Sequence, residues 1–218
     1  SRLHALEVLK GPSSIAYGPH TVGGAVNLVT RPAQWTNFAE MDLTVGTDQF
    51  QTLSAQGEFV SGDTSYLVDA LHYASDGFKE LDDGADTGFV RNDFNIKVHW
   101  QPQTDLQQSF IIKVGYADED ANETYLGLTD EDFDNNPNRR YPASQLDRFI
   151  SDHSQLHLSH SMELSNSLQI NSKLYFNQFN RSWNKFDGFI DGTNASLVLQ
   201  APSEYLDAYQ VLTGSVNS

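Results

Sequence analysis

The chain has 218 residues, of which 39% are hydrophobic and 19% charged, and its formal net charge is −16. A chain of this length can form one domain or part of a larger one. The negative charge argues against a nucleic-acid partner, because phosphate binding requires a basic surface. Since cysteine is absent, disulfides, thiolate metal sites and cysteine nucleophiles are all excluded.

Two further features concern membrane insertion and the start of the chain. No run of about 18 apolar residues occurs, so the sequence predicts no transmembrane helix. The first residues also lack the charged segment and apolar core of a signal peptide. The N-terminus therefore looks truncated.

The segment LEVLKGPSSIAYGPHTVGGAVNLVTR, residues 6–31, joins two short apolar runs through glycines and prolines. Glycines permit positive φ or a close backbone approach, prolines fix turns, and residues 25–30 suit a buried strand. These properties alone predict a compact loop between strands. The stretch GPSSIAYG has the glycine spacing of a Walker loop, but the lysine that should follow is missing, which argues against phosphate binding.

The same segment resembles the last part of the plug domain of TonB-dependent outer-membrane receptors. The matching residues are Glu7, Val8, Gly11, Pro12, Tyr17, Gly18, Gly23, Gly24, Asn27, Thr30 and Arg31. The resemblance implies that residues 1–32 are the C-terminal end of a plug domain. It also implies that Glu7 and Arg31 are charged plug residues that contact the wall of a surrounding barrel.

After Pro32, segments of about ten residues alternate between apolar and polar side chains, as expected of strands in a transmembrane β-barrel. The two clearest are 92–100 and 106–116. One face of the first carries Phe94, Ile96, Val98 and Trp100, and one face of the second carries Phe110, Ile112, Val114 and Tyr116. Because side chains alternate across a strand, these residues would face lipid and their polar neighbours a wet interior. Ile111 is an exception on the polar face.

Short and long connections alternate along the chain. Strands are expected near 39–46, 52–59, 65–74, 92–100, 106–116, 150–162 and 168–181, with an eighth beginning near Tyr205. The long connections lie near 76–91, 118–148 and 182–204, and outer-membrane barrels place long loops outside and short turns in the periplasm. Plugged transporters have about 22 strands. The sequence thus predicts an all-β fold in which residues 33–218 form about seven or eight strands of a partial transmembrane antiparallel β-barrel.

The resemblance extends to residues 122–148, which look like the corresponding loop of receptors in the ferric citrate and ferric-siderophore subfamily. Within this loop Thr129 is placed to cap a short helix, because its hydroxyl can accept from a backbone N–H and acidic residues follow it. Arg139 and Arg140 come next. Their guanidinium groups could bind a chelated ferric anion through paired donors, or they could pair with Asp130, Asp132 or Asp134 and only order the loop.

Metal and catalytic sites find little support. Asp130, Asp132 and Asp134 imitate the start of a calcium-binding EF-hand loop, but Asn135 and Tyr141 replace the required glycine and glutamate. Among the strand histidines, His153 and His157 share a face whereas His160 lies on the other, so at most two ligands converge. No G-x-S-x-G nucleophile motif occurs. The sequence predicts neither a metal site nor catalysis.

The resemblance implies a receptor in the outer membrane of a Gram-negative bacterium that takes up ferric citrate or a ferric siderophore. Its partners would be outer-membrane lipid, the ferric chelate and the TonB complex, reached through a Ton box upstream of this sequence. Iron would be cargo within the chelate, and no resident cofactor is expected. The alternatives are uptake of cobalamin or a glycan, a non-transporting surface or adhesion barrel, and a soluble β-rich binding domain.

Overall fold

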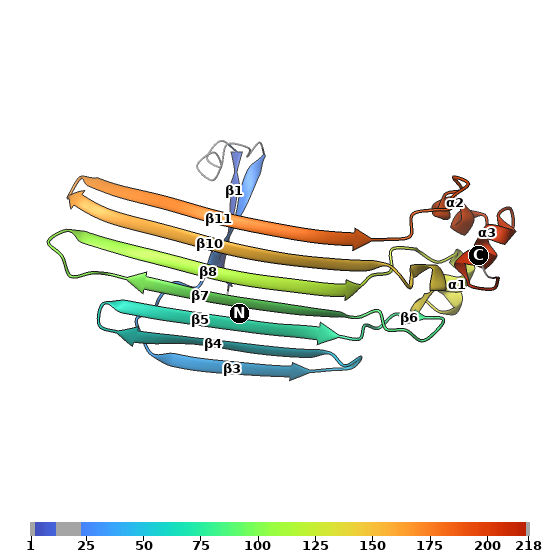
Figure 1. Cartoon of the computed structure of the whole chain (residues 1–218), viewed down its shortest axis with the longest axis horizontal. Helices are drawn as coiled ribbons and strands as arrows, with labels where there is room; N and C mark the ends of the chain where they lie inside the picture. The colour runs from blue at the N-terminus through green and yellow to red at the C-terminus, as the bar shows by residue number, and fades with distance from the viewer. Residues whose placement is uncertain (1–2, 12–22, 217–218) are drawn as a thin grey trace.

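The computed structural model describes residues 3–11 and 23–216. Its main element is a seven-stranded antiparallel sheet in the order β11-β10-β8-β7-β5-β4-β3 (Figure 1). These strands are β3 (Phe38–Val45), β4 (Gln51–Ser61), β5 (Thr64–Ser75), β7 (Phe89–Trp100), β8 (Gln107–Asn122), β10 (Arg148–Ser165) and β11 (Leu168–Asn184). Each of these strands pairs with the next one along the chain, so the sheet is a series of hairpins. The seven strands predicted from the alternating pattern are confirmed.

Smaller elements lie beside the sheet. A separate hairpin of β1 (Leu3–Lys10) and β2 (Gly24–Thr30) precedes it. The connections contain β6 (Glu80–Leu81), α1 (Asp130–Asn135), β9 (Arg139–Arg140), a 3-10 turn (Pro142–Ser144), α2 (Ala195–Gln200) and α3 (Leu206–Leu212). The α-helices and β6 gather at one end of the sheet (Figure 1). Within the described ranges, no helix is long and apolar enough to cross a membrane.

The predicted apolar stripes of β7 and β8 lie directly opposite each other. The register pairs Phe94 with Tyr116, Ile96 with Val114, Val98 with Ile112 and Trp100 with Phe110. Phe94 is 44% exposed and Val114 49% exposed, so the stripe is open on its outer side. The opposite face carries the alternate residues, including Asn95 opposite Gly115 and Lys97 opposite Lys113. The predicted separation of an apolar and a polar face is therefore confirmed.

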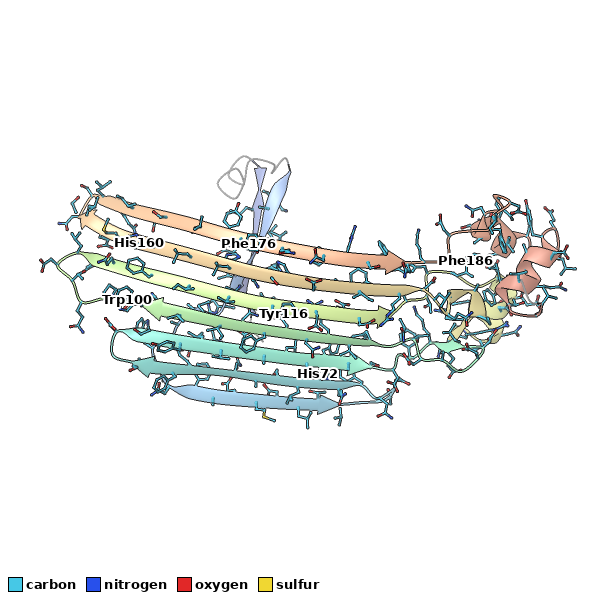
Figure 2. The ribbon with its side chains drawn as sticks, in the orientation of Figure 1. His72, Trp100, Tyr116, His160, Phe176 and Phe186 are labelled. Atoms are coloured by element: carbon cyan, nitrogen blue, oxygen red, sulfur yellow. The ribbon has the colours of Figure 1, made fainter. Side chains whose placement is uncertain are left out.

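The apolar face continues across the sheet. Leu156 and Leu158 of β10 are opposite Val114 and Ile112 of β8, and on their other side they meet Phe176 and Leu174 of β11. Figure 2 shows Tyr116 and Phe176 near the middle of this sheet and Trp100 near the short-turn end. Large contiguous apolar surfaces on a protein indicate contact with another apolar phase or a partner. The outer strands β3 and β11 also leave the described sheet open at both edges.

The connections alternate in length as predicted. Short turns at 62–63, 101–106 and 166–167 lie at one end of the sheet, and the long connections 76–88 and 123–147 lie at the other. The tight loop after β3 is the exception, and there Asp48 and Gln49 adopt left-handed backbone angles with φ of 53° and 51°.

The prediction of an eighth strand near Tyr205 is wrong, because this region forms α2 and α3. Asn194 caps α2 by accepting a hydrogen bond from the backbone N–H of Ser196. Val198 and Leu212 are fully buried, and they pack in the loop core with Leu126, Tyr141 and Ala195. Burial against neighbouring loops outweighs the weak strand pattern and selects helices.

Candidate functional site

The long connections pack together into a loop cluster, defined here as α1, β6, β9, α2, α3 and the residues between β8 and β10. Its first element is α1, which begins after Thr129. The Thr129 hydroxyl accepts a hydrogen bond from the backbone N–H of Asp132 at 3.2 Å. This contact satisfies an otherwise unpaired amide of the first turn. The predicted helix cap is therefore confirmed.

Asp132 is the centre of the cluster. One carboxylate oxygen, Oδ2, accepts hydrogen bonds from the hydroxyls of Tyr141 and Tyr209 at 2.5 Å and 2.6 Å. The other, Oδ1, pairs with Nη1 of Arg139 at 2.6 Å. Arg139 and Tyr141 belong to one segment, in β9 and directly after it, whereas Tyr209 is in α3. The Asp132 carboxylate therefore connects α1 with two other parts of the chain, the segment that contains β9 and Tyr141, and α3.

These contacts set the ionisation of the group. Burial alone would raise the pKa of Asp132, but hydrogen bonds from Tyr141, Tyr209 and Thr129 and the charge of Arg139 hold it below its usual value. Burial and the bond to Asp132 raise the pKa of both tyrosines. The cluster is thus built around an ionised carboxylate and two neutral phenols.

Arg139 connects this centre to another loop. Its Nε and Nη2 donate to the two carboxylate oxygens of Asp82 at 2.8 Å and 2.9 Å, and its guanidinium carbon lies 5.1 Å from the centre of the Tyr141 ring. The hydrogen bonds to Asp82 raise the pKa of Arg139 above its usual range, and the charge of Asp132 adds to this shift. In the described ranges Arg139 forms no ion pair with Asp130 or Asp134.

Arg140 has a different environment. Its Nη1 donates to the backbone carbonyls of Pro137 and Arg139, and burial lowers its pKa. Over the residues that the structure describes, no ion pair joins Arg140 to a carboxylate. The two adjacent arginines predicted as ligand contacts are thus inequivalent.

A groove of about 460 Å³ lies within the loop cluster, between α1, α2 and α3. Its lining includes Thr129, Asp130, Glu131, Leu199, Leu206 and Tyr209. Two carboxylates on an otherwise apolar and neutral wall would repel an anionic ligand. The groove therefore does not provide the charge that a carboxylate-bearing chelate requires.

The β1–β2 hairpin carries the plug-like motif. Asn27 Nδ2 donates to Glu7 Oε2 at 2.8 Å, and the two residues are directly opposite in the register. Gly24 has φ of 155°, and a Cβ placed there would lie 2.5 Å from the Leu9 carbonyl oxygen, so the pairing requires glycine. Gly11 also has a positive φ of 74°, whereas Gly23 has open space around it. Pro12, Tyr17 and Gly18 lie outside the described residues.

Arg31 lies against the first strand of the sheet. Its Nη1 lies 3.8 Å from Glu40 Oε2 in β3, and Lys97 of β7 donates to the Arg31 carbonyl at 2.6 Å and to Thr30 Oγ1 at 2.9 Å. Glu7 differs, because within the described ranges its hydrogen bond stays inside the hairpin. The end of the hairpin is therefore attached to the polar face of the sheet.

Glu58 of β4 binds the two residues Gln34 and Trp35, which follow the hairpin in the chain. It is 3% exposed and accepts from the backbone N–H groups of Gln34 and Trp35 at 3.0 Å and 2.8 Å and from the Ser65 hydroxyl at 2.6 Å. Trp35 has a left-handed φ of 57°, and its ring centre lies 5.2 Å from that of His99. Sequence reasoning did not select Glu58, because an acidic residue on the polar face of a strand is ordinary.

The strand histidines are arranged as predicted. The registers put His153 and His157 on one face, while His160 on the other face stacks on Phe110 at a ring-centre distance of 4.3 Å. Through the described ranges, no group of three or more His, Cys, Asp or Glu residues is arranged to hold a metal ion.

The fold is that of a segment of an antiparallel β-barrel wall, with a hairpin attached to its polar face and packed loops at one end. In sequence, an 85-residue region of this chain is 35% identical to the metal-pseudopaline receptor CntO of Pseudomonas aeruginosa. The aligned region covers 38% of this chain and 12% of that protein. A 65-residue region is 32% identical to the probable TonB-dependent receptor BfrD of Bordetella pertussis, covering 30% of this chain and 9% of that one. No family model matches.

A solved structure agrees in fold. The siderophore receptor PiuA of Acinetobacter baumannii matches with a TM-score of 0.62 and 16% identity, over 83% of this chain and 26% of that chain. The predicted resemblance to TonB-dependent receptors is thereby confirmed, and the chain has the sequence features and the fold of this class. The matches span about an eighth or less of the curated relatives' length. These relatives are named as receptors, in agreement with the expectation that the chain is not an enzyme.

Proposed function

We propose that this chain is part of an outer-membrane receptor of a Gram-negative bacterium that takes up a ferric chelate, either ferric citrate or a siderophore complex. The observation that carries the proposal is the exposed apolar stripe centred on 94–100 and 110–116, in a sheet whose fold matches a siderophore receptor over 83% of this chain. A face of this kind suits lipid on one side of a barrel wall, and the polar face suits a wet interior.

The architecture also suggests an orientation. With residues 1–32 as the end of the plug and residues 33–218 as the first part of a barrel of about 22 strands, the short turns would face the periplasm. The loop cluster would then lie at the cell surface, since long loops are extracellular in such barrels. The plug-like hairpin would lie inside the barrel, where Lys97 and Arg31 attach it to the wall.

Substrate and energy source follow from the receptor class. CntO is named as a metal-pseudopaline receptor, and PiuA is named as a siderophore receptor, and both names support our proposal of a ferric chelate as cargo here. We place the chelate contact in the loop cluster that carries Arg139 and Arg140. Energy would come from the TonB complex through a Ton box upstream of this sequence, and iron would be transported rather than retained.

Uptake by cells carrying the full-length gene tests the proposal. Radiolabelled iron supplied as ferric citrate, or as one of a panel of ferric siderophores, should accumulate in cells with TonB and fail to accumulate without it. A matched culture expressing the receptor with an inactive upstream Ton box is the control for surface expression. Uptake of cobalamin or a glycan in place of iron would identify another nutrient, and a surface protein that takes up none of them would indicate an adhesion or structural barrel.

A further inference from the structure

The short parallel ladder between β6 and β9 has two faces with opposite electrostatic character. Its register pairs Glu80 with Arg139 and Leu81 with Arg140. Because side chains alternate across a strand and directly paired residues share a face, Arg139 lies with Glu80 and Asp82. By the same alternation, Arg140 lies with Leu81 and Lys79.

On the first face, carboxylates outnumber the single arginine. Arg139 binds both oxygens of Asp82 and one oxygen of Asp132. A bidentate arginine–carboxylate pair is geometrically specific and strong. The guanidinium of Arg139 is therefore already occupied, and its contacts tie the loop after β5 to α1.

The second face carries two cations that no ion pair balances within the described ranges. Lys79 Nζ donates to the neutral Thr124 hydroxyl at 2.9 Å, and Arg140 donates to backbone carbonyls. Over the same ranges neither side chain forms a salt bridge, although the Glu123 carboxylate is near enough to Lys79 to act on it.

The two cations act on each other electrostatically. Burial lowers the pKa of Lys79, the positive charge of Arg140 lowers it further, and Glu123 opposes the shift. Like charges that are partly removed from water repel each other. An anion placed between them would relieve that repulsion and gain two charge-assisted contacts.

We propose that Lys79 and Arg140 together bind the carboxylate groups of an anionic ferric chelate, while Arg139 is a positioning residue that holds the loops. This inference rests on the proposed function and narrows its ligand to chelates with free carboxylates. Arg140 supplies paired, planar donors, and Lys79 supplies a compact point charge. Leu81, which is 5% exposed, lies on the same face of the ladder and provides it with a buried apolar anchor.

Binding to purified full-length receptor in detergent tests the assignment. The probes are ferric citrate, which is anionic, and a neutral ferric trihydroxamate chelate. We expect Lys79→Gln and Arg140→Gln each to weaken ferric citrate binding by about tenfold or more, as loss of a charge-assisted contact does. Binding of any neutral chelate should change less than about twofold, since such a chelate has no net charge for the two cations to attract.

Thermal stability separates binding from a structural role. Removal of one of two neighbouring cations relieves repulsion, which offsets the loss of its own hydrogen bond, so Lys79→Gln and Arg140→Gln should change the melting temperature little. Arg139→Gln is the matched control at the adjacent position, and it should lower the melting temperature and expose the loops to protease because Asp82 and Asp132 lose their partner.

The outcomes distinguish this inference from the function on which it rests. Ferric citrate binding that survives both Lys79→Gln and Arg140→Gln would overturn the inference and leave the transport proposal intact, as would wild-type receptor that binds only the neutral chelate. A wild-type receptor that binds no ferric chelate would overturn both. Weakened binding of anionic and neutral chelates alike, with a lower melting temperature, would overturn the inference by showing that the two cations only hold the loops together.

Discussion

Two carboxylates organise opposite ends of the sheet, and they do so through different partners. Glu58, near the short turns, binds the backbone N–H groups of Gln34 and Trp35. Asp132, in the loop cluster, binds the side chains of Tyr141, Tyr209 and Arg139. A contact to backbone tolerates many sequences in the partner segment, whereas a contact to side chains requires particular residues.

The two carboxylates also have different structural roles. Glu58 fixes one short connection, including the left-handed Trp35, at the point where the plug-like hairpin joins the sheet. A non-glycine residue in that conformation persists only where its surroundings enforce it. Asp132 instead unites segments that are far apart in the chain, since Arg139 and Tyr209 are joined through it. The first network holds a junction in place, and the second assembles a surface.

Replacement of Asp132 by Ala should produce the largest effect. It leaves Arg139 with one carboxylate fewer and removes the acceptor of two tyrosine hydroxyls, and loss of a partly buried charge partner costs about 3 kcal/mol. We expect hydrogen exchange to accelerate in α1, α3 and the residues around Tyr141, with the sheet unaffected. Asp130→Ala, also in α1, is the control. Equal protection in both variants would contradict a central role for Asp132.

Replacement of Glu58 by Gln should have the next largest effect, of about 2 kcal/mol, because a buried charge-assisted acceptor is replaced by a neutral amide. The backbone amides of Gln34 and Trp35 should exchange faster while the loop cluster keeps its protection. Glu40→Gln is the matched control, since the Glu40 side chain is 55% exposed and its pair with Arg31 is long at 3.8 Å. Faster exchange at both ends of the sheet would refute the separation of the two networks.

Tyr209→Phe should cost about 1 kcal/mol, the usual value of one hydrogen bond. The variant keeps the ring that packs against the loop core and removes only the donor to Asp132. Protease cleavage within 201–216 should increase modestly. The control is Tyr205→Phe, which alters another tyrosine packed against the same core. If both variants behave like wild type, the side-chain network does not hold α3.

The strands of the sheet could be predicted from the sequence far better than the side-chain contacts that join distant segments. Period-2 alternation in 92–100 and 106–116 is a local signal, and the register confirms it. The cap at Thr129 is equally local, because the accepting hydroxyl and the donating amide are three residues apart. Features of this kind can be read from neighbouring residues alone.

The remaining contacts depend on tertiary structure. Arg139 and Asp82 are 57 residues apart in the chain, and Tyr209 and Asp132 are 77 apart, so no local pattern relates them. The helices near Tyr205 were missed for the same reason, since they are stabilised by burial of Val198 and Leu212 in a core made by other loops. The distinction between Arg139 and Arg140 likewise appears only when β6 and β9 pair.

Acidification should have the smallest effect of the changes considered, because the ionisation of Asp132 does not change near neutral pH. The folded pKa of Asp132 lies below its ordinary value of 3.8, so its contribution to stability is fully present above that value and is lost as the pH falls through the folded pKa. Loop protection in wild type should therefore decrease as the pH is lowered below about 3.8. In Asp132→Asn the loop cluster should be less stable at neutral pH and change less on acidification. Parallel acid profiles for the two proteins would place the pH-sensitive group elsewhere.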